Sequence, residues 1–445
     1  MNISLRNLLI KFGALPHNGV ETLRHRAFKG GSWALVGAVL SQGLGLLCML
    51  VVARILKPEY FGEFSAIRTT TAMFGVFAGF GLGYTASKHI AEYRSIDPFR
   101  AGRIWGLVDM AAICTSLIVS FVIFFFSSYI SARILKAPHL ASILKISSVT
   151  VFFNTMIWVQ NFVLGGLEAF KRIAIVEISR GVLYFPILIA ASYFWGVYGA
   201  VLGLTFVSIG GFIVSKMMIS KESSRQSIYI DRHGGVKEFG IIIHFTLPAF
   251  ASSIVAISGQ WVSTAMLVRQ SGGMAQNGLL SAANQFPEII AFIPMTLGLP
   301  AVSIMSSIYG QGKYDQFKKL VWANVGGIGL LTVIIAGVVA VLGPYLISVY
   351  GEDYLSAVRL LQIGCVAVIF RSLSRMNSQI LVSMGRVKAE LICSTLGVVV
   401  MLLVWSFFLP YQAMGLSIAW CVSFLFLFVI QSSYVFRAVW SLNPV

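Results

Sequence analysis

Two arginines four residues apart are the residues of this sequence best placed to do chemistry. Arg371 and Arg375 lie in a long apolar stretch, and their spacing puts both guanidinium groups on one face of a helix. Counted back from the end of that stretch near residue 383, they lie roughly 12–18 Å inside it. Guanidinium forks match phosphate geometry, so we expect the pair to hold a phosphate group. The alternative is that Glu288 neutralises one arginine while the other reaches toward the membrane surface.

Other candidate substrate-binding residues also lie within apolar stretches: Arg68, Lys145, Arg180, Asn284, Gln42 and Gln260. Arg68 could take the same anion nearer the opposite membrane surface, or extend to that surface. Lys145 is close enough to the surface for its ammonium to reach it. Arg180 follows Glu177 by three residues, which is the spacing of a helical ion pair. The two glutamines could face a central space or join helices by hydrogen bonds.

Acidic residues inside apolar stretches are candidates for ion coupling or for charge pairing. We place Asp109, Glu177 and Glu288 in this class, because a proton-coupled or sodium-coupled carrier needs a protected carboxylate. Glu288 follows Pro287 in a stretch that other prolines also interrupt, and broken helices often line cavities. Asp109 lies near one membrane surface, where solvation or a basic partner could satisfy it.

The composition is that of a membrane protein. Of the 445 residues, 57% are hydrophobic and only 11% are charged, where about 25% is usual for soluble domains. The net charge of +17 does not indicate nucleic acid, because no polar domain carries a basic patch. Five isolated cysteines and the lack of catalytic motifs predict no metal, no cofactor and no enzyme activity.

Apolar stretches long enough to cross a membrane recur along the chain, which predicts an all-α polytopic protein of about twelve spans. In the first half they cover residues 31–53, 61–86, 104–127, 141–166, 173–194 and 196–219. In the second half they cover residues 239–268, 279–307, 318–342, 355–383, 389–409 and 412–436. Each half therefore forms a predicted six-helix bundle.

The basic residues predict the orientation. Most of the 33 Lys and Arg residues fall in the two terminal segments and in every second connection, which places both termini in the cytoplasm. The predicted domains are a cytoplasmic amphipathic segment (1–30), an N-terminal bundle (31–220), a cytoplasmic linker (221–238), a C-terminal bundle (239–436) and a cytoplasmic tail (437–445).

The two halves are related in sequence. GEFSAIR at Gly62 recurs as GLLSAAN at Gly278, an offset of 216 residues, and Gln42 and Gln260 match at nearly the same offset. Arg68 is then equivalent to Asn284. Several matches at one offset indicate a duplication, and an even number of spans makes the repeat parallel, with a binding site expected between the halves.

The segment ARILKPEYFGEFSAI, followed by FGLGYTASKHIAEY, resembles the opening of polysaccharide-biosynthesis flippases of the O-antigen type. These belong to the multidrug/oligosaccharidyl-lipid/polysaccharide exporter superfamily. The resemblance covers nearly the whole chain, including the 6 + 6 repeat and FTLPAF at the start of the seventh span. The region SGQW stands where related drug antiporters carry an acid, which weakens the drug-exporter interpretation.

The resemblance implies transport of a polyprenyl-diphosphate-linked oligosaccharide to the outer leaflet of a bacterial cytoplasmic membrane by alternating access. It implies membrane lipids, a glycan polymerase and chain-length machinery as partners, and cationic cavity residues that meet the diphosphate. An ion-coupled small-molecule exporter is the alternative. A membrane-embedded glycan polymerase or ligase is a third hypothesis, and the short outer loops argue against it.

Overall fold

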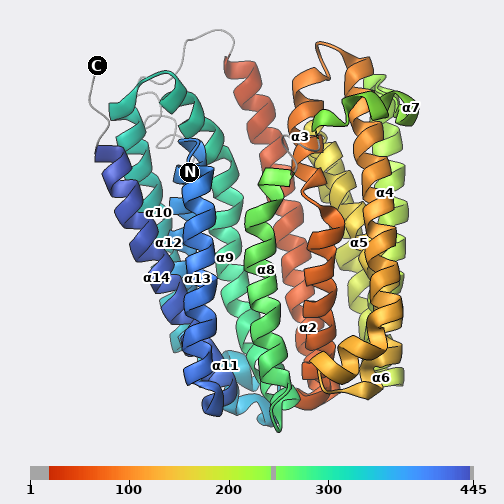
Figure 1. Cartoon of the computed structure of the whole chain (residues 1–445), viewed down its shortest axis with the longest axis vertical. Coiled ribbons are helices and arrows are strands. Elements are labelled where there is room, and N and C mark those ends of the chain that lie inside the picture. Colours follow the sequence, from red (N-terminus) through yellow and green to blue (C-terminus); the bar gives the residue numbers. More distant parts are fainter. Residues whose placement is uncertain (1–19, 242–246, 441–445) are drawn as a thin grey trace.

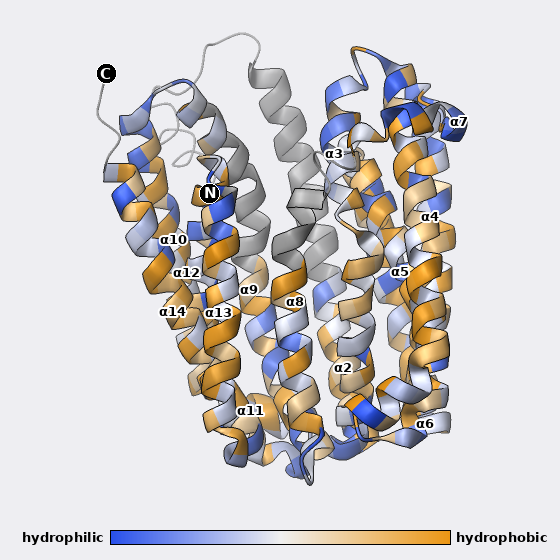
Figure 2. Ribbon diagram, viewed as in Figure 1, coloured by the Kyte–Doolittle hydropathy of each residue, from blue (hydrophilic) through white to orange (hydrophobic). Residues whose placement is uncertain are grey.

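The computed structural model describes residues 20–241 and 247–440 (Figure 1). These residues form long helices joined by short connections and include no strand. Hydrophobic residues cover the middle of the outward-facing helices, and hydrophilic residues gather toward the two ends (Figure 2). By length and composition, seven of the described helices could each cross a membrane. The number of twelve spans stays a prediction.

In the N-terminal half, two of the long helices fold back on themselves. The helices are α2 (Val20–Gly79), α3 (Leu82–Tyr93), α4 (Pro98–Tyr129), α5 (Ala141–Gly166) and α6 (Phe170–Gln226). Helix α2 turns at Lys57, whose φ of 60° and ψ of 169° are not helical. The following proline disfavours the helical conformation at that residue. Helix α6 turns at Gly196, where φ is 57° and ψ is −137°, a conformation that suits glycine.

The second predicted span, residues 61–86, is not one continuous helix. Helix α2 ends at Gly79 and α3 begins at Leu82, because Phe80 and Gly81 have φ values of 44° and 70°. Positive φ interrupts the right-handed helix, and the chain resumes as α3 after the break. The sequence is apolar on both sides of the break, so hydropathy alone did not predict it.

The C-terminal half repeats this pattern with separate helices. They are α8 (Leu247–Val268), α9 (Gly273–Gly310), α10 (Tyr314–Val341), α11 (Gly343–Ser348), α12 (Val358–Ser383), α13 (Val387–Phe407) and α14 (Gln412–Trp440). Residues 1–19 of the predicted N-terminal segment, 242–246 at the start of the seventh span, and 441–445 of the predicted tail lie outside the described residues.

The two halves touch at positions that the sequence repeat makes equivalent. The side-chain oxygens of Ser65 and Ser281, which are 216 residues apart, are separated by 2.5 Å. A Cβ atom built on Gly62 would lie 1.7 Å from the carbonyl oxygen of Met274, and one on Gly278 would lie 1.8 Å from that of Pro58. The small glycines therefore let helix backbones of the two halves pack directly on each other here.

Further bonds between the halves lie close to this glycine contact. Asn277 donates to the carbonyl oxygen of Gly62 at 2.8 Å, and the Tyr354 hydroxyl donates to that of Ala53 at 2.8 Å. Trp261 donates through Nε1 to the Thr70 hydroxyl at 3.0 Å. We call this region the closed end; it lies next to the turns that follow Lys57 and Val268.

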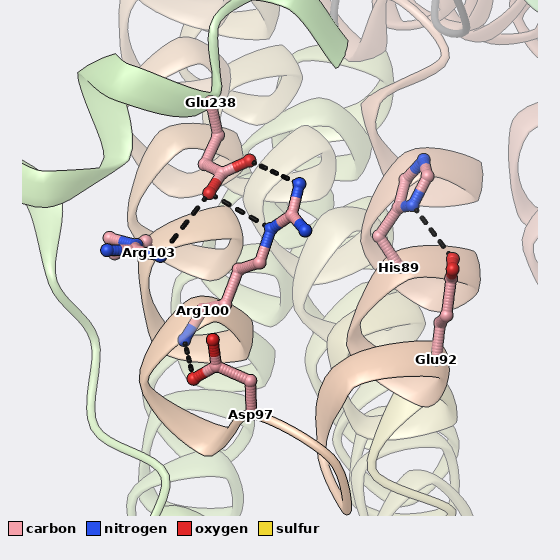
Figure 3. Close-up of polar contacts among 6 residues, drawn as sticks. All are labelled: His89, Glu92, Asp97, Arg100, Arg103 and Glu238. Carbon is pink, nitrogen blue, oxygen red and sulfur yellow. Dashed lines mark hydrogen bonds and ion pairs between the residues drawn. The ribbon is translucent and has the colours of Figure 1, made fainter.

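The segment between the halves is held against the N-terminal half at the opposite end (Figure 3). Arg100 donates to both carboxylate oxygens of Glu238 at 3.1 and 3.2 Å, and Arg103 lies 3.6 Å from the same carboxylate. The bond from Arg100 to Glu238 raises the pKa of the guanidinium. Arg232 pairs with the buried Asp109 at 2.7 Å. Helix α7 (Arg232–Gly235) thus packs on α4 through charged pairs.

Replacing Gly278 with alanine should destabilise the fold. The new methyl group would overlap the Pro58 carbonyl, and overpacking of this kind costs about 1–3 kcal/mol. Gly337→Ala in α10 is the matched control, because nothing lies within 4 Å of its Cβ position. Thermal unfolding of the purified chain in detergent should show a lower Tm for Gly278→Ala only. Equal Tm values for both variants would contradict the backbone contact.

Candidate functional site

A large cavity lies between the two halves. It has a volume of about 1400 Å³, above the ~300–1,000 Å³ of ordinary small-molecule pockets. Its walls come from α2, α3, α5 and α6 in the N-terminal half and from α8, α9, α12, α13 and α14 in the C-terminal half. The cavity can therefore hold a large ligand that touches both halves at once.

The arginine pair of α12 lines the wall that the C-terminal half contributes. Arg371 donates from Nη1 to Glu288 Oε1 on α9 at 2.5 Å, and its guanidinium lies 5.9 Å from the ring centroid of Phe424. Arg375 is exposed in the cavity, and none of the ion pairs among the described residues includes it. One arginine is thus neutralised, and the other remains available for an anion.

Arg68 also reaches the cavity, from α2 in the N-terminal half. Its Nη1 lies 3.2 Å from the Met49 thioether sulfur, and its guanidinium is 5.7 Å from the Phe64 ring centroid. These contacts are weak, and no acid pairs with Arg68 in the part of the chain that the structure describes. Asn284, its equivalent in the repeat, lines the same cavity.

A polar network occupies the cavity wall formed by α5 and α6. Arg180 lies 3.4 Å from Glu177 Oε2 and donates from Nη2 to the Asn154 side-chain oxygen at 3.3 Å. Asn161 donates to Glu177 at 2.7 Å, and the Ser208 hydroxyl donates to Asn154 at 3.1 Å. The predicted pairing of Arg180 with Glu177 is therefore present, and the pair faces the cavity.

The cavity gathers nine of the eleven residues named as candidates from the sequence: Arg68, Arg371, Arg375, Asn284, Gln42, Gln260, Arg180, Glu177 and Glu288. Lys145 is not among the lining residues, because its ammonium lies 5.7 Å from the ring centroid of Phe124 on α4. Asp109 is also elsewhere, buried in its ion pair with Arg232. Its contacts are those of charge pairing.

Sequence reasoning missed one acid of this cavity. Glu390 on α13 lines it and accepts hydrogen bonds from Ser394 at 2.8 Å and from Gln431 at 2.9 Å. No described cation pairs with Glu390. It stands one residue inside the predicted span 389–409, so a strict inventory of acids within the spans would have found it.

The charges suit an anion surrounded by polar groups. Arg68 and Arg375 have no acidic partner among the described residues, whereas Arg180 and Arg371 are paired. Serine, threonine, asparagine and glutamine side chains fill much of the remaining wall and can bond neutral hydroxyl groups. No described group of three or more His, Cys, Asp or Glu side chains could hold a metal ion.

Comparison with curated proteins identifies relatives along most of the chain. It is 22% identical over 374 residues to the lipopolysaccharide biosynthesis protein WzxC of Escherichia coli K12, covering 82% of this chain and 72% of WzxC. It is 26% identical over 280 residues to the EPS I polysaccharide export inner membrane protein EpsE of Ralstonia nicotianae, covering 61% of this chain and 62% of EpsE.

Solved structures share the fold at low sequence identity. An inward-facing multidrug resistance transporter of the MATE family, in the MOP superfamily, matches with a TM-score of 0.71 and 13% identity, covering 92% of this chain and 98% of that one. The lipid II flippase MurJ in an inward closed conformation also matches with a TM-score of 0.71, at 16% identity, covering 92% of this chain and 89% of MurJ. Both support the two-lobed helical architecture.

Family profiles give the assignment. The MatE profile matches residues 248–408, in the C-terminal half. The polysaccharide biosynthesis protein profile matches residues 27–297, more than half of the chain and including the LKPEYFGEFSAI segment. The chain therefore belongs to the polysaccharide biosynthesis protein family.

Proposed function

We propose that this protein is a flippase that moves a polyprenyl-diphosphate-linked oligosaccharide across a bacterial cytoplasmic membrane for surface polysaccharide synthesis. The observation that carries the proposal is the exposed Arg375 beside the Arg371–Glu288 pair, in a cavity large enough for a glycan. The names of WzxC and EpsE as polysaccharide biosynthesis and export proteins support it, as does the structural likeness to MurJ.

The cationic groups of the cavity support a diphosphate as part of the cargo. A charged headgroup cannot cross hydrocarbon without compensation, and an arginine held inside the membrane supplies it. The polar wall offers hydrogen bonds to sugar hydroxyls. Because the halves meet near the Lys57 turn, which is predicted to lie outside, the closed end faces outward and the cavity accepts its cargo from the cytoplasm. Both termini are cytoplasmic in this proposal.

Export of the glycan tests the function directly. A strain that lacks this protein should lose its surface polysaccharide and accumulate lipid-linked oligosaccharide in the inner leaflet, and the restored gene should reverse both effects. Unchanged surface polysaccharide, with no such accumulation, would contradict the proposal. A glycan polymerase and chain-length machinery are the partners expected to use the exported product.

Removing both arginines should weaken diphosphate binding. Hydrogen bonds to charged groups contribute about 1.5–3 kcal/mol each, so Arg371→Ala with Arg375→Ala should weaken farnesyl diphosphate binding by at least about tenfold. The variant with lysine at both positions should lose less affinity, because it keeps both positive charges and loses only the forked hydrogen-bond donors of the guanidinium groups. Calorimetry on purified protein in nanodiscs measures both.

Lys145→Ala is the matched control for the arginine variants. Its cation also lies within a predicted span but rests on Phe124 and does not line the cavity. We expect its affinity for farnesyl diphosphate to equal that of the unchanged chain. Unaltered binding in the double arginine variant would reject the role of the pair.

Glu288→Gln separates the proposed function from its alternative, an ion-coupled small-molecule exporter. Loss of the carboxylate frees Arg371, so binding of farnesyl diphosphate should become several-fold tighter. An exporter that uses Glu288 for ion coupling should instead lose transport without gaining affinity for the diphosphate. Calorimetry combined with an efflux assay in vesicles distinguishes the two outcomes.

A further inference from the structure

Two exposed aromatic side chains of the N-terminal half line the cavity, which the Arg371 pair lines from the C-terminal half. Tyr84 of α3 and Trp158 of α5 are 48% and 37% exposed, and both face the cavity. Their ring centroids are 6.0 Å apart at an interplanar angle of 85°. Phe162 packs behind them, 5.1 Å from Tyr84 and 4.6 Å from Trp158. Large aromatic surfaces thus stand open in a wall that also carries polar side chains such as Asn154.

The backbone beneath the aromatic pair is shaped to seat Trp158. A Cβ on Gly83 would lie 2.9 Å from Trp158 Cζ3 and 2.7 Å from the Phe162 ring, and one on Gly79 would lie 3.3 Å from Trp158 Cζ3. These glycines flank the helix break between α2 and α3. The break and the glycines together let the benzo edge of the indole rest on the backbone and fix the ring in place.

Polar atoms of the aromatic pair remain available to a ligand. The indole N–H of Trp158 and the hydroxyl of Tyr84 have no hydrogen-bond partner among the described residues, whereas Trp261 donates to Thr70. Asn154 lies one helical turn before Trp158 and lines the cavity beside it. Rings that carry free donors next to an amide bind amphipathic ligands.

A sugar ring is the ligand chemistry that fits this wall. Pyranose rings have an apolar C–H face that stacks on aromatic rings and a rim of hydroxyl groups that need hydrogen-bond partners. A lipid tail would leave the indole N–H of Trp158 and the hydroxyl of Tyr84 without partners.

We propose that Tyr84 and Trp158 form a sugar-stacking subsite in the N-terminal half. The inference rests on the proposed function, because it assigns the glycan of the cargo to this wall and the diphosphate to Arg371 and Arg375. The cargo then bridges both halves of the molecule. The arginines then bind the diphosphate of the cargo, and the aromatic rings bind its sugar.

The test measures binding of two separate fragments to the purified full chain in nanodiscs. One probe is the oligosaccharide repeat released by mild acid from the lipid-linked pool of the host, and the other is farnesyl diphosphate. Because Trp158 supplies a large exposed ring on which a sugar face can stack, Trp158→Ala should weaken oligosaccharide binding by about tenfold or more. Its affinity for farnesyl diphosphate should stay that of the unchanged chain.

Three further variants keep the test decisive. Trp158→Phe retains a ring and should lose less affinity than Trp158→Ala, and Tyr84→Ala should lose affinity even if Trp158→Ala does not fold. Trp322→Ala is the matched control, because Trp322 on α10 is 59% exposed but does not line the cavity. Its affinity for the oligosaccharide should be unchanged.

The outcomes separate this subsite from the proposed function. Unchanged oligosaccharide binding in Trp158→Ala and Tyr84→Ala, or an equal loss in Trp322→Ala, overturns the subsite. If the unchanged chain binds farnesyl diphosphate but not the oligosaccharide, the subsite is also overturned. The proposed function is not contradicted by that result. Oligosaccharide binding that depends on Trp158 without any diphosphate binding supports the subsite and contradicts the proposed role of the arginines.

Discussion

The backbone contact between Gly62 and Gly278 is the constraint on which the rest of the structure depends. Carbonyl groups of the opposite half occupy the positions that side chains would take, so the two helices approach more closely than any other residue would allow. The bond between Ser65 and Ser281 continues this contact by one helical turn. Because the halves rest on each other at the closed end, the space between them lies elsewhere, and it forms the cavity.

The contact is symmetric, but the cavity beside it is not. The same offset that pairs the glycines and the serines sets Arg68 opposite Asn284, a cation against a neutral amide. The C-terminal half places two arginines on α12, and the N-terminal half places two aromatic rings on α3 and α5. Duplication thus supplied the frame, and divergence between the copies placed arginines and aromatic rings at different positions in the two halves.

Features that depend on residues close together in the sequence could be predicted, whereas contacts between distant segments could not. Hydropathy located the fourth span at residues 141–166, the same bounds as α5, because membrane thickness dictates the length of an apolar helix. The repeat indicated two related halves with a binding site between them, but it did not predict that the matching glycines and serines touch each other. Composition, hydropathy and the offset were therefore enough to predict an all-helical membrane protein with two related halves.

Side-chain direction could not be predicted in the same way. Arg68 and Lys145 are both basic residues near one membrane surface, yet the first lines the cavity and the second lies on Phe124. Which face of a helix turns inward depends on packing between helices distant in sequence. The partner of Asp109, Arg232, is likewise 123 residues away. Trp158 escaped notice because a lone tryptophan in an apolar stretch carries no spacing signal.

The pairing of charges suggests an order of events for an entering anion. Arg375 is free in the cavity, whereas Arg371 is bound to Glu288 on α9. An anion therefore meets Arg375 first and must then compete with Glu288 for Arg371, which loosens a link between α12 and α9. A ligand shifts a conformational equilibrium only through such differential interactions. Exchange of the Glu288 pair for a phosphate contact is thus one physical route by which occupancy of the cavity could alter the packing of the half that binds the anion.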